Sequence, residues 1–421
     1  MTSSARDHQP PRARRVPARP ALRALPPLAV ALSTLALISC VGAPGRPAAG
    51  PSGGRPSPAA PATDGSGAVG SQPAAASPAA LPSLTPAQKA GQRVIYSYGG
   101  LDPPASLLSW IRHGEVGGVI FFGGNIASRA QIAGVIRQLD QANASASNPL
   151  HAVPLLLMTD QEGGLVRRLP GRPVQSEKQI GGAAHPAAAA RAAGTGAGRN
   201  LAGVGMNVNL APVLDVYRVA GDFDDQFGRS YSTSPPVVSA LGADFIKAQQ
   251  ATGVAATAKH FPGLGAAASS QNTDTGPVTI DLGLHALRTV DEYPYQAAIA
   301  AGVKLVMVSW AVYPALAPGT PAGLSSAVVN GELRTRLGFR GVTITDALEA
   351  GALQAFGTTG QRATLAVRAG MDLILCSAQR AGQGRQARSA LATGLSHGTL
   401  SASVFDAALM RIIALRAGLR R

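Results

Sequence analysis

Eight short apolar runs recur along the chain from residue 94 onward, and Ala-rich stretches long enough to form helices separate them. Each run is bounded by Gly or by polar residues, an alternation that is typical of a parallel α/β fold. Eight parallel strands within about 340 residues favour one TIM-like (β/α)8 barrel over a doubly wound sheet, although periodicity alone does not separate the two. The runs are Val94–Tyr98, Val116–Phe122, Val153–Thr159, Met206–Ala211, Val254–Ala258, Leu305–Ser309, Val342–Thr345 and Asp372–Cys376.

Polar residues follow three of these runs at the point where each strand is expected to end. Residues 160–164 (Asp-Gln-Glu-Gly-Gly) follow the third run, residues 259–263 (Lys-His-Phe-Pro-Gly) follow the fifth, and Asp346 follows the seventh. A fourth polar segment, residues 222–230, contains Arg229 and lies in the long insertion after the fourth run. Because the carboxyl ends of barrel strands converge on one face, these clusters predict a single pocket there.

The first 84 residues differ in composition from the rest of the chain. Five arginines between residues 12 and 23 precede an apolar run over residues 25–38, as in a secretory signal. That run of about 14 residues is short for a bilayer span, which needs about 20. Residues 41–84 are mostly Gly, Ala, Pro and Ser, a composition that cannot bury enough surface to fold, so we expect a disordered tether. The folded domain is therefore predicted over residues 85–421.

The end of the apolar run, Leu37-Ile38-Ser39-Cys40, resembles the lipobox of bacterial lipoproteins. That resemblance implies a lipoprotein signal peptide over residues 1–40, acylation of Cys40 and an extracytoplasmic protein anchored to the membrane by lipid alone. An ordinary signal peptide with an incidental cysteine is the alternative. The export route stays open, because Arg14-Arg15 is followed by a poor match to a twin-arginine signal.

The net charge of +15 does not indicate nucleic-acid binding. Of the 37 cationic residues, 32 are Arg, and residues 84–421 spread 29 positive and 20 negative charges along their length, which points to compositional bias rather than to a basic patch. The two cysteines, Cys40 and Cys376, exclude a disulfide scaffold and a cysteine-based zinc site. We see no nucleotide, flavin or metal motif, so the sequence predicts no cofactor and no metal. A monomer is expected.

Five segments resemble, in order, glycoside hydrolase family 3, and most closely its single-domain bacterial β-N-acetylglucosaminidases. The resemblance covers residues 85 to 415, and two of the segments, Lys-His-Phe-Pro-Gly and Asp-Gln-Glu-Gly-Gly, are highly specific for the family. The segments are residues 160–164, 209–215 (Asn-Leu-Ala-Pro-Val-Leu-Asp), 228–231 (Gly-Arg-Ser-Tyr), 259–263 and 338–346 (Gly-Phe-Arg-Gly-Val-Thr-Ile-Thr-Asp).

This resemblance implies a barrel enzyme that hydrolyses terminal β-glycosides with retention, through a covalent glycosyl-enzyme. It implies that Asp346 is the nucleophile and that the sugar subsite consists of Asp160, Arg229, Lys259 and His260. The expected substrate is a saccharide, most plausibly β-linked N-acetylglucosamine from cell-wall fragments, with β-glucosidase-type specificity as an alternative. Glu162 is expected either to bind ligand or to pair with Arg167 or Arg168, and Asp215 to have a structural or supporting role.

The loop after Lys-His-Phe-Pro-Gly departs from the family pattern. The acetylglucosaminidases carry a His after the Gly and then an Asp-Ser/Thr-His whose last His serves as acid/base, whereas this chain has Leu264 and then Asp274-Thr275-Gly276. Four interpretations remain open. Asp274 acts as the acid if burial raises its pKa; another carboxylate acts instead; only reactive substrates are cleaved; or the protein binds glycans without cleaving them. The other carboxylates considered are Asp222, Asp224, Asp225 and Glu349.

Overall fold

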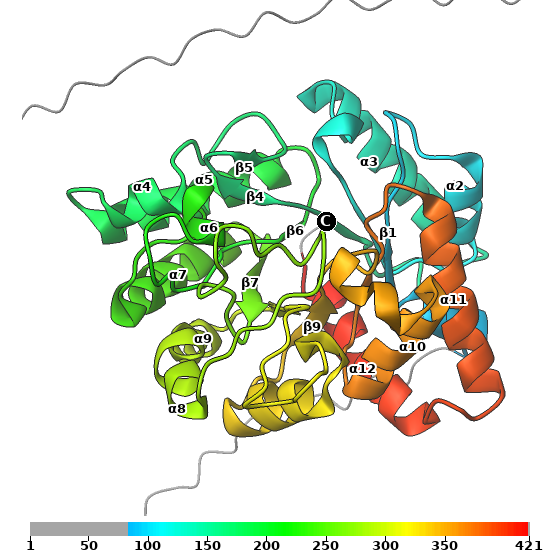
Figure 1. Cartoon of the computed structure of the whole chain (residues 1–421). Helices are drawn as coiled ribbons and strands as arrows, with labels where there is room; N and C mark the ends of the chain where they lie inside the picture. The colour runs from blue at the N-terminus through cyan, green and yellow to red at the C-terminus, as the bar shows by residue number, and fades with distance from the viewer. Residues whose placement is uncertain (1–82, 420–421) are drawn as a thin grey trace, which may run out of the picture. The chain divides into compact units, whose positions relative to one another are not determined.

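A computed structural model describes residues 83–419, and the predicted barrel is confirmed there. The predicted signal peptide, the lipidation site Cys40 and nearly all of the predicted tether lie outside the described residues. Within the described part, all eight apolar runs contain strands of one parallel sheet (Figure 1). The order in the sheet is β10-β1-β2-β3-β6-β7-β8-β9. These strands are β1 (Val94–Tyr96), β2 (Gly118–Ile120), β3 (Leu156–Thr159), β6 (Val208–Asn209), β7 (Ala255–Phe261), β8 (Leu305–Val308), β9 (Val342–Thr345) and β10 (Ile374–Leu375).

The sheet closes on itself between its two outer strands. Ile344 in β9 forms a parallel bridge with Leu373, which directly precedes β10. The Leu373 amide donates to the carbonyl of Thr343 at 2.9 Å, and the Thr345 amide donates to the carbonyl of Leu373 at 3.0 Å. Each of the eight barrel strands thereby has a neighbour on both sides, as the barrel architecture requires.

Side chains alternate between the inside and the outside of the barrel along each strand. In β3, Leu156 and Met158 belong to the cluster that fills the interior, whereas Leu157 packs in the larger cluster between the strands and the helices. Both sets are buried. This double burial explains why the strands read as continuous apolar runs in the sequence.

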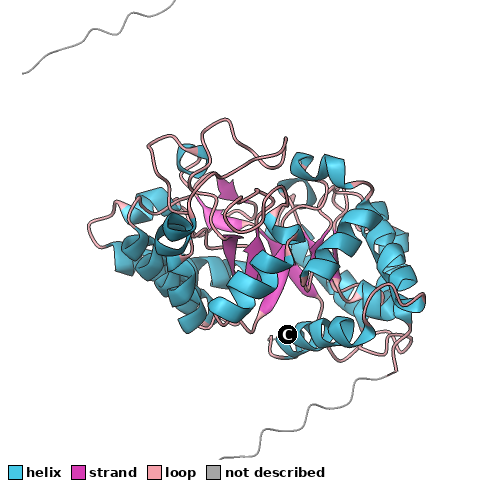
Figure 2. Cartoon of the chain, turned by 60° about the horizontal axis from the view of Figure 1, so that its bottom comes forward, coloured by secondary structure: helices cyan, strands magenta, loops and turns pink. Residues whose placement is uncertain are grey.

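Helices surround the barrel, and Figure 2 shows the strands enclosed by them. An added antiparallel hairpin, β4 (Gln161–Gly163) with β5 (Val166–Arg167), follows β3. The helices are α1 (Pro86–Gly91), α2 (Ala105–Arg112), α3 (Arg129–Asn143), α4 (Glu177–Gly181), α5 (Pro186–Ala202), α6 (Phe223–Gln226), α7 (Pro235–Gln250), α8 (Leu284–Ala286), α9 (Tyr293–Ala300), α10 (Thr359–Ala369), α11 (Ala381–Ser396) and α12 (Ala402–Ala417). Short 3₁₀ turns are η1 (Gly123–Asn125), η3 (Ala322–Leu324) and η5 (Gly351–Phe356), and π-helical segments are η2 (Leu287–Asp291) and η4 (Ala327–Arg336).

The last helix, α12, covers the end of the barrel where the strands begin. Ile412 reaches the interior cluster. Arg416 Nε donates to the carbonyl of Pro154, just before β3, at 2.6 Å, and Arg411 Nη2 binds Asp372, just before β10, at 2.7 Å. The opposite end, where the strands finish, is left for the pocket.

The first helix of the described part, α1, begins with a capping box. Thr85 accepts a hydrogen bond from the Gln88 amide, and the Gln88 side chain accepts one from the Thr85 amide, forming a capping box before the helix. In the described part of the chain, none of the helices combines the length and apolar character that a membrane crossing requires.

Candidate active site

A cavity of about 350 Å³ lies at the carboxyl ends of the barrel strands. That volume falls in the range of small-molecule sites. Asp160 follows β3, Lys259 and His260 lie at the end of β7, and Asp346 follows β9. All six residues predicted for the catalytic and sugar-binding site line this one cavity. Its charged and polar lining is Asp160, Glu162, Arg168, Arg229, Lys259, His260, Asn272, Thr273, Asp274, Asp346 and Ser377.

Lys259 joins the two acidic residues that follow β3. Its Nζ atom lies 2.8 Å from Asp160 Oδ1 and 2.7 Å from Glu162 Oε1. Burial alone would lower the pKa of Lys259, but the two carboxylates outweigh that effect and raise it. Lys259 therefore remains an ammonium group and holds Asp160 at the wall of the pocket.

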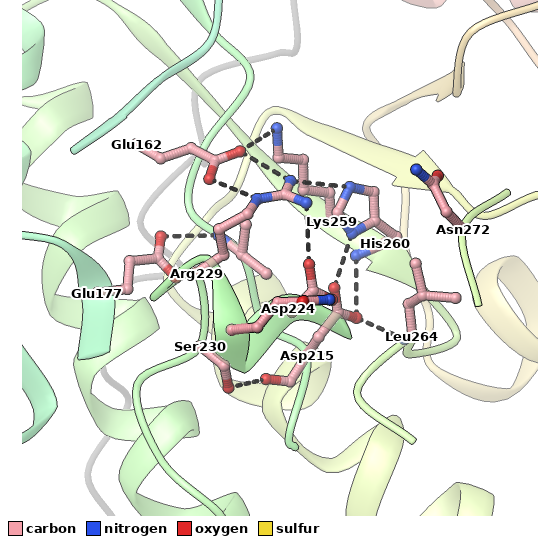
Figure 3. A network of polar contacts seen from close by, with 12 residues as sticks. Glu162, Glu177, Asp215, Asp224, Arg229, Ser230, Lys259, His260, Leu264 and Asn272 are labelled. Carbon is pink, nitrogen blue, oxygen red and sulfur yellow. Dashed lines mark hydrogen bonds and ion pairs between the residues drawn. The ribbon is translucent and has the colours of Figure 1, made fainter. Parts of the chain in front are cut away.

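Glu162 also binds Arg229, as Figure 3 shows. Arg229 Nε and Nη2 donate to the two Glu162 oxygens at 2.9 and 3.0 Å, a bidentate geometry that fixes the guanidinium plane. Burial alone would raise the pKa of Glu162, but Arg229 and Lys259 lower it to about 2. The expected pairing of Glu162 with Arg167 or Arg168 is therefore wrong. Arg167 and Arg168 are close in sequence, but Arg229 and Lys259 approach from other parts of the barrel and make the contacts instead.

A second acidic residue, Asp224 in α6, holds the other side of Arg229, with Arg229 Nη1 2.9 Å from Asp224 Oδ1. Burial raises the pKa of Asp224 to about 7 against the opposing effect of Arg229. The arginine is thus held between Glu162 in β4 and Asp224 in α6, so its guanidinium has little rotational freedom left to lose when a ligand binds.

His260 is oriented by Asp215, which lies after the Asn-Leu-Ala-Pro segment. Asp215 Oδ2 lies 2.7 Å from His260 Nδ1, and the other ring nitrogen, Nε2, lies 3.5 Å from Arg229 Nη2. Burial lowers the pKa of His260 to about 4, and Arg229 lowers it in the same direction. The imidazole is therefore neutral at pH 7, with its proton on the nitrogen that faces Asp215. A ring that is neutral at pH 7 has no extra proton to donate, so His260 is unsuited to replace the acid/base His that the loop lacks.

Asp346 lines the same cavity, and the residue after it is held on both sides. Asp346 Oδ1 accepts a hydrogen bond from the Ala347 amide at 2.7 Å, and the buried Trp310 donates from Nε1 to the Ala347 carbonyl at 2.8 Å. Burial raises the pKa of Asp346; His260 opposes that rise, and the nearby Asp274 carboxylate adds to it.

Asp274 reaches this cavity from the loop over residues 264–276, and its side chain is also exposed to solvent. Desolvation in the cavity raises its pKa, although Arg229 opposes the rise, and the carboxylates of Glu349 and Asp160 raise it further. This is the direction that a carboxyl group needs if it is to hold a proton near neutral pH.

The other four carboxylates considered as proton donors do not line this cavity. Each already has a partner: Asp222 accepts from the Val219 amide, Asp224 pairs with Arg229, Asp225 pairs with Lys178, and Glu349 accepts from the Ser377 hydroxyl and the Gln383 amide. Among the proton donors weighed from the sequence, Asp274 alone shares the cavity with Asp346.

Two further residues that the sequence did not assign to the site lie against this network. Glu177, in α4, is buried, and burial together with the Glu162 charge raises its pKa well above the ordinary value. Arg168 lines the cavity, and its Nε atom has no hydrogen-bond partner among residues 83–419. Neither directly follows a strand of the barrel, so the strand pattern could not have placed them.

Asp215, Asp224 and His260 form a group whose ligand atoms approach a metal-binding arrangement, within 4.8 Å of one another. Their atoms already have protein partners, because His260 Nδ1 contacts Asp215 and Asp224 binds Arg229. The guanidinium beside them also disfavours a cation, so we assign no metal to this cluster.

The glycosyl hydrolase family 3 N-terminal domain model matches residues 89–415. The chain belongs to glycoside hydrolase family 3. A protein described as an uncharacterized secreted glycosyl hydrolase from Arthroderma benhamiae is 48% identical over 333 residues, which cover 79% of this chain and 94% of that protein. A β-hexosaminidase from Stenotrophomonas maltophilia is 34% identical over 320 residues, covering 72% and 90%.

Solved structures of the same family share the fold. A β-N-acetylglucosaminidase from Paenibacillus superposes with a TM-score of 0.74 at 37% identity over 80% of this chain, which spans 63% of that protein's length. A β-N-acetylhexosaminidase from Beutenbergia cavernae superposes with a TM-score of 0.71 at 32% identity, covering 79% of this chain and 99% of that protein. This chain is a glycosidase, and a saccharide is its substrate.

Proposed function

We propose that this glycosidase removes terminal β-linked N-acetylglucosamine with retention, using Asp346 as nucleophile and Asp274 as general acid and base. One observation carries the proposal: Asp274 lines the cavity together with Asp346, whereas the other candidate carboxylates do not line it and are bound by other groups. The names of the β-hexosaminidase relatives support the choice of sugar.

In the first step, the protonated Asp274 carboxyl gives its proton to the glycosidic oxygen while an Asp346 oxygen attacks the anomeric carbon. The bond between that carbon and the leaving oxygen breaks, and the sugar is left as an ester of Asp346. In the second step, the Asp274 carboxylate takes a proton from water, whose oxygen attacks the same carbon and releases Asp346. Two inversions restore the original β configuration.

The remaining cavity residues bind and orient the sugar. Asp160 offers an anionic acceptor, and Arg229 and Lys259 offer donors that are already held in place by Glu162. Fixed donors and acceptors of this kind orient hydroxyl groups without further ordering at the moment of reaction. His260 presents a neutral ring edge beside them.

The test of the nucleophile compares the purified protein with its Asp346→Asn variant on aryl β-N-acetylglucosaminide, aryl β-glucoside and a cell-wall disaccharide. Turnover should be lost in the variant while saccharide binding persists, and NMR should show the β anomer as first product. Undiminished activity in the variant would reject Asp346. Cleavage of the glucoside alone would change the assigned sugar, and binding of the disaccharide without any cleavage would make this a glycan-binding protein.

The test of the general acid compares the cleavage rates of the wild type and Asp274→Asn on aryl glycosides whose leaving groups differ in pKa. General-acid assistance is worth about 10²–10⁴ in rate. Phenolate is a poor leaving group and needs the proton, whereas dinitrophenolate does not. Cleavage of a phenyl glycoside should therefore slow far more than cleavage of a dinitrophenyl glycoside. An equal effect on both substrates would exclude Asp274 as the donor.

We further propose that the protein is exported and attached to the membrane by acylation of Cys40, where it meets cell-wall fragments. The lipobox-like segment before Cys40 supports the lipid anchor, and the description of the Arthroderma relative as secreted supports export. In cells that express the full chain, a Cys40→Ala variant should leave the membrane fraction. Retention of that variant in the membrane fraction would reject the lipid anchor.

A further inference from the structure

The loop over residues 264–276, which carries Asp274, is attached to the rest of the molecule near both of its ends. Near its start, the Phe223 amide donates to the Ala267 carbonyl at 2.9 Å and Gln226 Nε2 donates to the Ser269 carbonyl at 2.8 Å. Both donors belong to α6, the helix that carries Asp224 and so holds Arg229. The first half of the loop is therefore tied to the sugar-binding side of the cavity.

The second half of the loop is tied to η5, the 3₁₀ turn that begins five residues after Asp346. The Gly351 amide donates to the Asp274 carbonyl at 2.8 Å, and the Ala352 amide donates to the Thr273 carbonyl at 3.0 Å. Both contacts join main chain to main chain. The segment that follows the nucleophile thus binds the very residue proposed as the acid.

Gly351 permits this approach because a larger residue would not fit. A Cβ atom at position 351 would lie 2.4 Å from the carbonyl carbon and oxygen of Thr275 and 2.8 Å from the Gly276 nitrogen. Gly351 does not occupy the left-handed region of backbone conformation. Space, rather than backbone freedom, therefore requires glycine, and an alanine would push the Asp274 loop away from η5.

We propose that Gly351 is a positioning residue, which docks the Asp274 loop on the turn after Asp346 and so sets the separation of the two carboxyl groups. This inference rests on the proposed role of Asp274. Retaining glycosidases need their two carboxyl groups about 5–5.5 Å apart. A displacement of about 1 Å at a reacting group can cost on the order of 10² in rate. The loop is docked by backbone hydrogen bonds, so no side-chain motif in the sequence predicts the separation of the two carboxyl groups.

The experiment compares Gly351→Ala with Gly283→Ala, a change outside the loop at a glycine that is not left-handed and where an added Cβ would meet no heavy atom within 4 Å. Gly351→Ala should slow a phenyl glycoside about 10²-fold and a dinitrophenyl glycoside much less, which is a dependence on leaving group that general loss of structure would not produce. Gly283→Ala should match the wild type on both. Equal slowing of both substrates, or behaviour like that of Gly283→Ala, would overturn the inference.

Asp274→Asn in the same series separates the two proposals. If Asp274→Asn slows the phenyl glycoside selectively and Gly351→Ala does not, the positioning role fails and the acid assignment stands. If Asp274→Asn affects both substrates equally, the acid assignment itself fails, and the positioning role fails with it.

Hydrogen exchange on the unaltered protein tests the docking even if Gly351→Ala does not fold. The amides of Gly351 and Ala352 should exchange on the order of 10² more slowly than free amides, because each donates to the Asp274 loop. Exchange of these amides at the rate of free amides, while the barrel strands stay protected, would show that the loop is not docked.

Discussion

Asp215 does not line the pocket, but both oxygens of its carboxylate contact residues that line it. Oδ2 holds the His260 ring, while Oδ1 accepts from the Leu264 amide at 2.6 Å, where the Asp274 loop begins. An amide in place of this carboxylate would set a donor against a donor, at Nδ1 or at the Leu264 amide. One residue therefore fixes both the His260 ring and the start of the loop that carries Asp274.

Asp215→Asn should reduce kcat/KM about 10–100-fold, mainly through a higher KM, because the misplaced His260 ring binds sugar less well. The matched control is Ser230→Ala, which removes the hydrogen bond from the Ser230 hydroxyl to the Asp215 backbone carbonyl and leaves the carboxylate in place. Steady-state kinetics on an aryl glycoside, with the melting temperature of each variant, make the comparison. A loss no greater than that of Ser230→Ala would show that Asp215 is only structural.

The Asp274 carboxylate raises the pKa of Asp346, and this interaction predicts how activity depends on pH. In the proposed mechanism, turnover needs Asp346 ionised and Asp274 protonated, so the profile of activity against pH should be bell-shaped. In Asp274→Asn the repulsion is removed and the pKa of Asp346 falls. With a dinitrophenyl glycoside, the acidic limb should therefore move to lower pH and the alkaline limb should disappear. An acidic limb that stays in place would show that the two groups are not coupled.

At the scale of elements, the strands could be predicted and the contacts that complete the site could not. Burial on both faces makes each strand an apolar run, and Asp160 and Asp346 follow such runs directly, so periodicity alone placed them at one end of the barrel. The partner of Glu162 was missed because Arg229 lies 67 residues away, in a loop with no periodic pattern. The docking of η5 was missed because it is made by backbone atoms, which carry no residue-specific signal.

The helix pair α5 and α7 packs closely because glycines line the contact. A Cβ atom at Gly194 would lie 2.3 Å from the Phe245 carbonyl oxygen, whereas at Gly134 in α3 it would meet only the flexible end of Arg137, at 3.7 Å. Gly194→Ala should therefore destabilise the protein by about 1–3 kcal/mol. Gly134→Ala should stabilise it by about 0.5–1 kcal/mol, because alanine is the better helix former. Urea unfolding measures both, and a stabilising Gly194→Ala would contradict the close packing of α5 on α7.

Across the whole molecule, the two ends of the barrel are built differently. At the end covered by α12, Asp372 is bound by both Arg334 and Arg411, an arrangement that ties the last helix to the strands. Around the pocket, by contrast, burial raises the pKa of several carboxyl groups, Asp224 and Asp291 among them. Burial of these carboxyl groups around the pocket costs part of the folding free energy, so the stability of the protein should depend more on pH than its ion pairs suggest.

Asp291 isolates this effect, because it is fully buried under the Lys-His-Phe-Pro-Gly segment and takes no part in the proposed chemistry. Its Oδ2 lies 2.5 Å from Arg218 Nη2, and its Oδ1 has no hydrogen-bond partner among residues 83–419. Burial raises the pKa of Asp291 to about 7, although Arg218 opposes the rise. The folded state therefore holds a proton that the unfolded state releases near pH 4. The resulting stability is fully present below about pH 4 and is lost as the pH rises towards 7.

Asp291→Asn mimics the protonated form and should remove this dependence. The free energy of unfolding of the wild type should fall between pH 5 and pH 7 more steeply than that of the variant, by up to about 1.4 kcal/mol per pH unit. His260, whose pKa of about 4 lies below its usual value, adds a slope of the opposite sign, but it does so in both proteins and cancels in the difference. Asp281→Asn, at an exposed carboxylate, should follow the wild-type curve. If urea unfolding at the two pH values gives parallel changes for the wild type and Asp291→Asn, then Asp291 is ionised in the folded protein and Arg218 outweighs its burial.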